Sequence, residues 1–315
     1  MNFFRFNLLV VAGLTLLPPH KVIAAEAVIT NQLSDSVSIV NVETMTVTSD
    51  VKIGGKPAGV ALSSDKSRAY VTAPDSGELV EVDLNAKVVA RRLKLGSGPL
   101  GVAAHPTKPE VYVADWYVHK IIVIDTVTFK SVAEVNVGQS PSGLAVTPDG
   151  QLLLSADRDS NAVSIIDVET RKVSATVAVG ERPFGITVDR TGHRAYTANV
   201  GSDDVTVVDI ASRTVVGTAA VGRRPYAVAL AQGKAFVTDQ YAGTISAFDT
   251  ASLKLTNTIE ACDHPEGIEA NAFEAALYIA CWGDDVVLKL DPATLAITGR
   301  VKVGGGPRAF GRFLR

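Results

Sequence analysis

Short stretches of alternating apolar and polar residues follow one another along the chain, and from residue 27 onward they recur in one fixed frame. Each frame opens on Gly-x-x-Pro (Cys-x-x-Pro once), and in six frames a later stretch ends in an acid, as in VSIID up to Asp167. The marking prolines are 42, 42, 42, 42, 40 and 42 residues apart, at Pro57, Pro99, Pro141, Pro183, Pro225, Pro265 and Pro307. Four short strands in a period of about 40–45 residues are typical of a β-propeller blade.

The two ends of the chain complete each other within this frame. After Pro307 one strand remains, RAFGRFLR, whereas the N-terminal part supplies three strands that begin at Val28. We therefore predict an all-β fold, a seven-bladed β-propeller with four antiparallel strands per blade, closed by one C-terminal strand plus three N-terminal strands. This closure removes the free sheet edge that could recruit another chain. Residues 26–315 are expected to form this single domain.

The first 25 residues differ from the repeat and have the pattern of a signal peptide. Arg5 supplies positive charge, residues 6–17 form an apolar run, and small residues precede a cleavage point near Ala25. The apolar run is shorter than the roughly 20 residues of a membrane-spanning helix. We expect a mature chain without a transmembrane segment, in the periplasm or secreted.

Charge and motif content argue against several classes of function. The formal net charge is −3 and no basic block is present, which argues against binding to duplex nucleic acid. The sequence contains no nucleophile elbow, P-loop, His-Glu-x-x-His or dinucleotide-binding motif. It therefore indicates no cofactor and no metal site, and favours a monomeric binding protein over an enzyme, although an active site assembled from several loops leaves no such motif.

The two cysteines, Cys262 and Cys281, fall in the same blade. Cys262 replaces the repeat's glycine before the first strand, and Cys281 ends the second strand. Because these strands are antiparallel neighbours, we expect the two thiols to meet and form a disulfide in an exported protein. The alternative is a metal site with Asp263 and His264, although no standard zinc spacing is present.

Binding residues are expected on the loops of one face, where the Gly-x-x-Pro loops and the loops between second and third strands surround the channel. The residues that close the second strands form a ring there, namely Asn31, Ala73, Asp115, Asp157, Asn199, Asp239 and Cys281. These side chains either offer oxygen ligands to a cation or cap their own loops.

Aromatic residues and arginines distinguish some of these loops. The only two tryptophans, Trp116 and Trp282, occupy matching positions in the second and sixth blades. An exposed tryptophan beside charge is typical of a binding anchor, and a tryptophan that fills a gap above the blade is the alternative. Arginines beside aromatics suit an anionic or planar ligand, or are simply solvated.

The predicted ligand-binding set combines these loop residues. It consists of Asp115, Trp116, Tyr117, His119, Arg158, Arg182, Arg224, Tyr226, Tyr241, His264, Glu266, Trp282 and Arg308. Within it, His264 and Glu266 could act as an acid–base pair, although no nucleophile stands beside them. His105 and His193 fall in turns on the opposite face and are expected to be solvated.

The repeat resembles that of the YVTN β-propeller family. The resemblance rests on Tyr70 to Thr72 (YVT) and Tyr196 to Asn199 (YTAN), with Pro-x-Gly-Val-Ala and Val-x-Val-Ile-Asp elements, and covers residues 27–315. It implies a surface or periplasmic binding protein that presents a loop face to a protein or small ligand. Some similar propellers form the cofactor-free subunit of periplasmic amine dehydrogenases. The alternative is therefore an enzyme or enzyme subunit, either the propeller subunit of an amine or quinone-dependent dehydrogenase or a loop-built, metal-dependent lyase or hydrolase.

Overall fold

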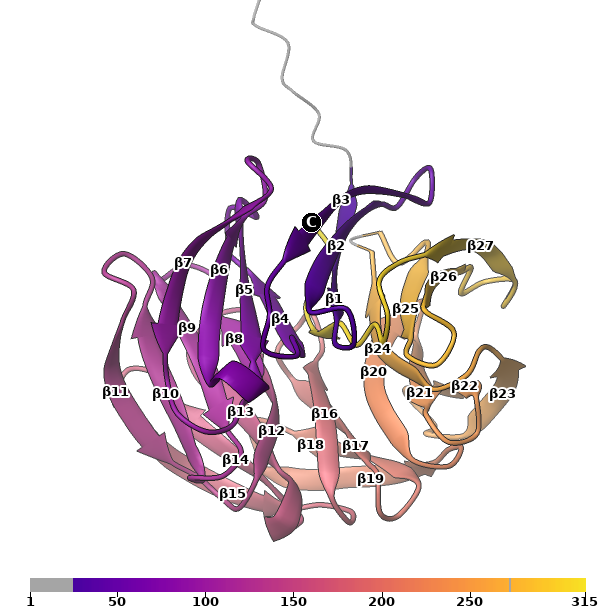
Figure 1. Ribbon diagram of the computed structural model, residues 1–315. Helices are drawn as coiled ribbons and strands as arrows, with labels where there is room; N and C mark the ends of the chain where they lie inside the picture. The colour runs from indigo at the N-terminus through magenta and orange to yellow at the C-terminus, as the bar shows by residue number, and fades with distance from the viewer. Residues whose placement is uncertain (1–24, 272) are drawn as a thin grey trace, which may run out of the picture.

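Seven β-sheets surround a central axis in the computed structural model, which describes residues 25–271 and 273–315 (Figure 1). Residues 1–24 of the predicted signal peptide therefore lie outside the described part of the chain. Besides strands, this part has only two 3-10 helices, η1 (Pro74–Ser76) and η2 (Arg158–Ser160). No helix within it is long and apolar enough to span a membrane. The predicted seven-bladed β-propeller is confirmed.

Six blades are consecutive in the chain, and each runs from the channel outward in four antiparallel strands. Blades 1 and 2 comprise β4 (Gly59–Leu62), β5 (Arg68–Ala73), β6 (Glu78–Asp83), β7 (Val88–Lys94), β8 (Pro99–Ala104), β9 (Glu110–Asp115), β10 (Lys120–Asp125) and β11 (Lys130–Asn136). Blades 3 and 4 comprise β12 (Pro141–Val146), β13 (Leu152–Asp157), β14 (Ala162–Asp167), β15 (Lys172–Ala178), β16 (Pro183–Val188), β17 (Arg194–Asn199), β18 (Asp204–Asp209) and β19 (Thr214–Ala220). Blades 5 and 6 comprise β20 (Pro225–Ala231), β21 (Lys234–Asp239), β22 (Thr244–Asp249), β23 (Leu255–Glu260), β24 (Pro265–Ala270), β25 (Leu277–Cys281), β26 (Val286–Leu290) and β27 (Ile297–Lys302).

Blade 7 joins the two ends of the chain. Its outer strands are β1 (Glu26–Asn31), β2 (Ser36–Asn41) and β3 (Thr46–Lys52), which lie between blades 1 and 6 in Figure 1. The C-terminal segment runs antiparallel to β1, with bridges from Ala27 to Leu314 and from Asn31 to Pro307. The Val28 amide donates to the carbonyl of Phe313 at 2.9 Å. The predicted closure is therefore present.

The closing segment is less regular than the innermost strands of the other blades. Its only regular strand is β28 (Phe310–Gly311), which pairs in parallel with β4 of blade 1. Ala309 and Gly311 have φ angles of 46° and 128°, in the left-handed region, and these interrupt the extended backbone. The last segment thereby contacts both neighbours, β1 in its own blade and β4 in the next.

A bulge shapes the start of the innermost strand in five blades. In blade 3, Pro141 pairs with Asp157 and Leu144 pairs with Ser155, so the first strand carries one residue more than its partner. The same shift occurs in blades 2, 4, 5 and 6. A bulge changes the direction of nearby side chains. Here it lies beside the residue that follows each repeat proline.

Glycines near the same point let neighbouring innermost strands approach closely. A Cβ at Gly101 would lie 1.8 Å from the carbonyl oxygen of Ser142, and one at Gly143 would lie 2.5 Å from that of Phe184. Equivalent glycines in blades 1, 4 and 6 meet the next blade in the same way, and they are Gly59, Gly185 and Gly267. The Pro-x-Gly pattern therefore sets how tightly the blades gather around the channel.

The hydrophobic core lies between adjacent blades. One cluster combines Leu154 and Ile165 of blade 3 with Ala195 and Val208 of blade 4, all buried. Because each sheet packs against two neighbours, its buried face needs compact, β-branched side chains. This requirement accounts for the abundance of valine and isoleucine in the repeat.

We predict that Gly101→Ala destabilises the protein by about 2 kcal/mol or more, because the new methyl group overlaps a backbone carbonyl that cannot rotate away. Urea unfolding followed by circular dichroism measures the change. The matched control is Gly217→Ala in β19, where the Cβ would meet only the end of the Leu253 side chain at 2.8 Å. The control should stay within about 1 kcal/mol of the parent. Equal effects of both substitutions would contradict the proposed role of Gly101.

Candidate functional site

The upper face, defined here as the face of the Gly-x-x-Pro loops, carries a ring of buried polar side chains that fix its loops. Asp157 accepts hydrogen bonds from the hydroxyls of Ser155 (2.7 Å) and Ser164 (2.5 Å), and from the amide of Gly138 (3.0 Å). Asp239 is held in the same way in blade 5, by Thr244, Ser246 and the Gly222 amide. Both carboxylates are fully buried and bonded inside their own blades.

Asparagine replaces aspartate in this ring where a second carboxylate is nearby. The Asn199 amide donates to Asp204 at 2.5 Å and to Thr206 at 2.9 Å. In blade 7, Asn31 donates to two serine hydroxyls that in turn donate to Asp50. A second carboxylate at this distance would repel an aspartate, whereas an amide can donate to it. The ring therefore follows local hydrogen bonding, as the capping alternative expects. No cluster of three or more histidine, cysteine, aspartate or glutamate side chains suited to a metal occurs among the described residues.

Burial alters the acidity of these aspartates. Removal from water raises the pKa of Asp239 to about 6, against the opposing effect of its hydroxyl and amide donors. The pKa of Asp157 is raised for the same reason. Because the folded state then binds the proton more tightly than the unfolded chain, these groups lower the stability as the pH rises from about 4 to about 6.

His119 connects two blades. Its Nδ1 accepts a hydrogen bond from the amide of Ser140, in the next blade's Gly-x-x-Pro loop, at 3.1 Å. Asp35, Asn161, Asp203 and Asp285 accept equivalent amides from the following blades. All five residues have a positive φ angle, between 51° and 59°. The contact gives His119 a role in holding neighbouring loops together.

The residues that follow the repeat prolines form a second ring, at the upper end of the channel. Its members are Ala58, Leu100, Ser142, Phe184, Tyr226, Glu266 and Arg308. Blades 1 to 3 thus contribute small or aliphatic side chains, whereas blades 4 to 7 contribute aromatic and charged ones. Three residues of the predicted ligand-binding set, Tyr226, Glu266 and Arg308, meet here directly.

Three aromatic rings bridge the channel beneath this face. Phe184 packs against Phe310 with ring centroids 4.9 Å apart and against Tyr226 at 4.7 Å. Tyr226 and Phe310 lie 5.5 Å apart. Because blades 4 and 7 are not neighbours, the contact between Phe184 and Phe310 crosses the channel. Tilted and edge-to-face geometries of this kind are favourable.

The buried carboxylate of Glu266, beside these rings, is paired with an arginine and held by further hydrogen bonds. Glu266 is only 2% exposed; its oxygens accept from Nε of Arg308 at 2.7 Å and from Nε2 of Gln240 at 2.6 Å. The Gln240 oxygen accepts from Nε of Arg224, and Arg308 also donates to the hydroxyl of Tyr226. Burial raises the pKa of Tyr226, so its hydroxyl stays neutral. Both oxygens of Glu266 are therefore engaged, as a buried carboxylate requires.

Two arginines stack on aromatic rings at this face. The guanidinium carbon of Arg158 lies 5.4 Å from the Trp116 ring centroid, and that of Arg224 lies 4.6 Å from the Tyr241 centroid. Trp116 also approaches Phe184, with centroids 6.3 Å apart. Each pair combines a guanidinium with a flat apolar surface, which suits an anionic or planar group. The Arg158 guanidinium is also ion-paired with Asp159 at 2.5 Å.

The aromatic surface continues from blade 5 across blade 6. Tyr241 and His264 have ring centroids 5.8 Å apart, and His264 and Trp282 are 6.0 Å apart. The Trp282 indole donates to the side chain of Gln32 in blade 7 at 3.1 Å. These side chains form one continuous shelf over three blades.

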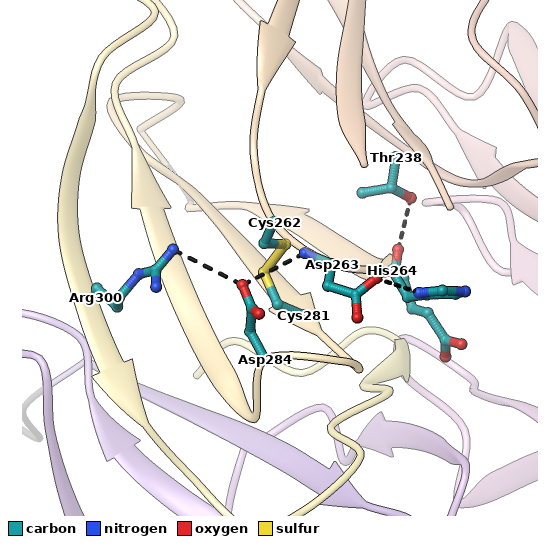
Figure 2. The surroundings of a disulfide bond; sticks show 8 residues. Thr238, Cys262, Asp263, His264, Cys281, Asp284 and Arg300 are labelled. Atoms are coloured by element: carbon teal, nitrogen blue, oxygen red, sulfur yellow. Dashed lines mark hydrogen bonds and ion pairs between the residues drawn. A yellow bond between two sulfur atoms is a disulfide. The ribbon is translucent and has the colours of Figure 1, made fainter. Parts of the chain in front are cut away.

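A disulfide joins Cys262 and Cys281 at the base of this shelf (Figure 2). Each sulfur is therefore bonded to the other and not offered to a metal. His264 shares a 2.5 Å hydrogen bond with Asp263. The suggested acid–base pair of His264 and Glu266 is not assembled, because Glu266 is buried against Arg308 instead.

The remaining candidates differ in exposure. Tyr117 is 65% exposed, whereas Asp115 is buried and accepts the Tyr117 amide at 3.1 Å. Arg182 is also exposed. The expectation for His105 was wrong, because it is 3% exposed and its Nδ1 accepts the amides of the following turn while Nε2 bonds the next blade's Gly150 carbonyl. His193 is exposed, as expected.

Three side chains of this face were missed from the sequence. Phe184 stands after a repeat proline, in register with Tyr226 and Glu266. Gln240 and Gln32 stand directly after the ring residue that ends the second strand, the position that Trp116 and Trp282 occupy in their blades. The repeat positions of Phe184, Gln240 and Gln32 were therefore visible in the sequence, next to those of Tyr226, Trp116 and Trp282.

Comparison with known proteins places the fold and no more. No protein-family model matches the chain, and no curated protein matches it. Among solved structures, hydrazine synthase of Kuenenia stuttgartiensis is 19% identical, with a TM-score of 0.77, 84% of this chain and 91% of that chain covered. A functionally unknown protein from Desulfotomaculum acetoxidans is 16% identical, with a TM-score of 0.76. The match covers 90% of this chain and 99% of that chain. Dihydro-heme d1 dehydrogenase NirN in complex with DHE is 12% identical, with a TM-score of 0.68. The match covers 92% of this chain and 76% of that chain. At these identities, the similarity shows a shared propeller fold.

We predict that Asp239→Asn removes part of the pH dependence of stability. The pKa of about 6, against 3.8 ordinarily, corresponds to about 3 kcal/mol. The parent should therefore lose up to about that much unfolding free energy, relative to the variant, between pH 4 and pH 7. Urea denaturation at four pH values in this window measures the difference.

The matched control is Asp209→Asn on an exposed turn, where hydrogen bonds from Ser212 lower the aspartate's pKa. Its pH-dependent effect should have the opposite sign and should lie below pH 4. If the difference in unfolding free energy between the parent and Asp239→Asn stays constant from pH 4 to pH 7, burial does not raise the pKa of Asp239 as assigned.

Proposed function

We propose that this chain is an exported, non-catalytic binding propeller of the YVTN-repeat type, whose upper face holds an anionic or planar group of a partner protein or a small ligand. The observation that carries the proposal is the stacking of Arg158 on Trp116 and of Arg224 on Tyr241. Solvent reaches this surface, since Tyr241 is 53% exposed. Tryptophan, tyrosine and arginine are the residues that most often dominate binding energies at interfaces.

The layer beneath supports binding rather than catalysis. Glu266 has its charge paired with Arg308, and His264 is bonded to Asp263, so neither is poised beside a nucleophile. Hydrogen bonds accepted by the side chains of His119, Asp35, Asn161, Asp203 and Asp285 tie five Gly-x-x-Pro loops to the preceding blade, and Asp239 ties a loop to its own blade. A rigid platform of this kind reduces the entropy lost on binding.

Export is supported by two independent features. The first 25 residues have the charge and apolar pattern of a signal peptide. The disulfide between Cys262 and Cys281 suits an oxidising compartment such as the periplasm or the exterior.

The alternative is an enzyme or an enzyme subunit. Two structural neighbours bear the names of enzymes, hydrazine synthase and dihydro-heme d1 dehydrogenase, and the latter is in complex with DHE. This alternative rests on shared architecture, since the upper face of this chain lacks an assembled acid–base pair. Recovery of a cofactor-bearing protein as the bound partner would favour it.

We predict that Trp116→Ala and Trp282→Ala each weaken capture of the partner from the exported fraction of the source cells by about 30-fold, because an interface anchor contributes about 2 kcal/mol. Immobilised protein serves as bait, and titration of the recovered partner gives the affinity. The matched control is Val127→Ala, a 72% exposed apolar residue in a turn on the opposite face. If both tryptophan variants recover the partner as well as this control does, Trp116 and Trp282 are not the binding anchors.

A further inference from the structure

The channel contains a cavity that opens on the lower face, away from the surface discussed above. Its volume is about 530 Å³, within the range of small-molecule sites. The wall comes from the innermost strands of blades 1 to 6. In blade 7, the closing segment contributes residues 310–312 and Leu314. The lower mouth is formed by turns between first and second strands, such as those at Lys66 and Arg190. Phe310 lies at the upper end, where it packs against Phe184.

A collar of equivalent residues surrounds the lower part of this cavity. Six blades place a half-buried apolar side chain there, and these are Leu62, Ala104, Val146, Val188, Leu230 and Ala270. Their spacing is that of the repeat prolines, 42 residues with one interval of 40. The seventh position, 42 residues after Ala270, is Arg312. One cation therefore stands in an otherwise apolar ring.

The fold itself gives little reason for this arginine. Arg312 approaches Glu269 at 3.3 Å, but its side chain is 88% exposed, and exposed ion pairs contribute little to stability. Glu269 already has a structural role, since its Oε2 accepts the amides of Phe313 and Leu314 and holds the C-terminal segment. Glu269 therefore has a structural role that does not require Arg312, and the exposed guanidinium of Arg312 is available to a ligand.

The charged residues that line the mouth include more cations than carboxylates. Lys66, Arg190 and Arg312 line the cavity, against the carboxylates of Glu269 and Asp189. Asp189 accepts the backbone amides of Thr191 and His193 in its own turn. Outside the lining, Glu274 pairs with Arg190 at 3.3 Å, which leaves Lys66 and Arg312 as the cations facing a ligand. Positive walls around an apolar cavity attract negatively charged ligands.

We propose that the lower channel binds a small amphipathic carboxylate, with its alkyl chain inside the apolar cavity and its carboxylate at Arg312. Water alone would fill the volume with roughly 18 molecules at about 30 Å³ each, and an alkyl chain that displaces poorly held water from an apolar wall gains affinity. The site is separate from the upper face and does not depend on the proposed function.

Isothermal titration calorimetry with decanoate and with decanol tests the assignment. Decanoate should bind the parent, and Arg312→Leu, which restores the apolar residue of the other blades, should weaken it by about fivefold while leaving decanol unchanged or tighter. Val146→Trp and Val188→Trp, which fill the collar, should abolish binding of both probes. Arg223→Leu, an exposed arginine on the upper face, is the matched control and should bind decanoate like the parent.

Three results would overturn the proposal. The first is no binding of decanoate to the parent. The second is equal weakening of decanoate by Arg312→Leu and by Arg223→Leu, which would indicate a general charge effect. The third is undiminished binding to both tryptophan variants, with thermal unfolding showing that they are folded, because the ligand would then lie elsewhere.

Discussion

The close approach of the innermost strands around the channel is the constraint on which the rest of the structure depends. At Gly101 and Gly143 the next blade's carbonyl oxygen occupies the space where a side chain would begin. Each sheet can then pack its apolar face against both neighbours, and the ring closes when the C-terminal segment pairs with β1 and touches β4. Ala227 and Ala309 stand at the equivalent positions of blades 5 and 7. A methyl group is therefore tolerated at only two of seven contacts.

This tight ring determines what the two faces present. At the upper end, the residues that follow the repeat prolines bring Phe184, Tyr226 and Arg308 together. The channel is bridged there by aromatic rings, beside the ion pair of Arg308 and Glu266. Loops above this layer are fixed by buried aspartates and by contacts between blades, and the stacked arginines occupy a rigid surface. At the lower end, smaller and aliphatic side chains leave an open cavity. One architecture thus offers a flat polar-aromatic surface and a narrow apolar one.

The repeat period predicted the blade count and the closure because both follow from spacing alone. The facing positions of Cys262 and Cys281 also followed, since strand order fixes which residues face each other. The contacts of individual side chains did not follow. His105 was expected in solvent, but the neighbouring blade's turn covers it, and His119 bonds the next blade's backbone. Such contacts depend on how one blade packs on the next, which a single repeat does not encode. Arg312 was visible in the sequence as a departure from the apolar pattern, but its position at a cavity mouth required the folded ring.

Native-state hydrogen exchange at the closure tests the central claim most directly. The amide of Val28, bonded to Phe313, and that of Arg308, bonded to Thr30, are compared with the amides of β14 inside blade 3. If ring closure is part of one cooperative structure, all of them exchange through the same global unfolding and share one protection free energy. Rapid exchange at Val28 and Arg308, with β14 still protected, would contradict the account and show that the ring opens independently of the blades.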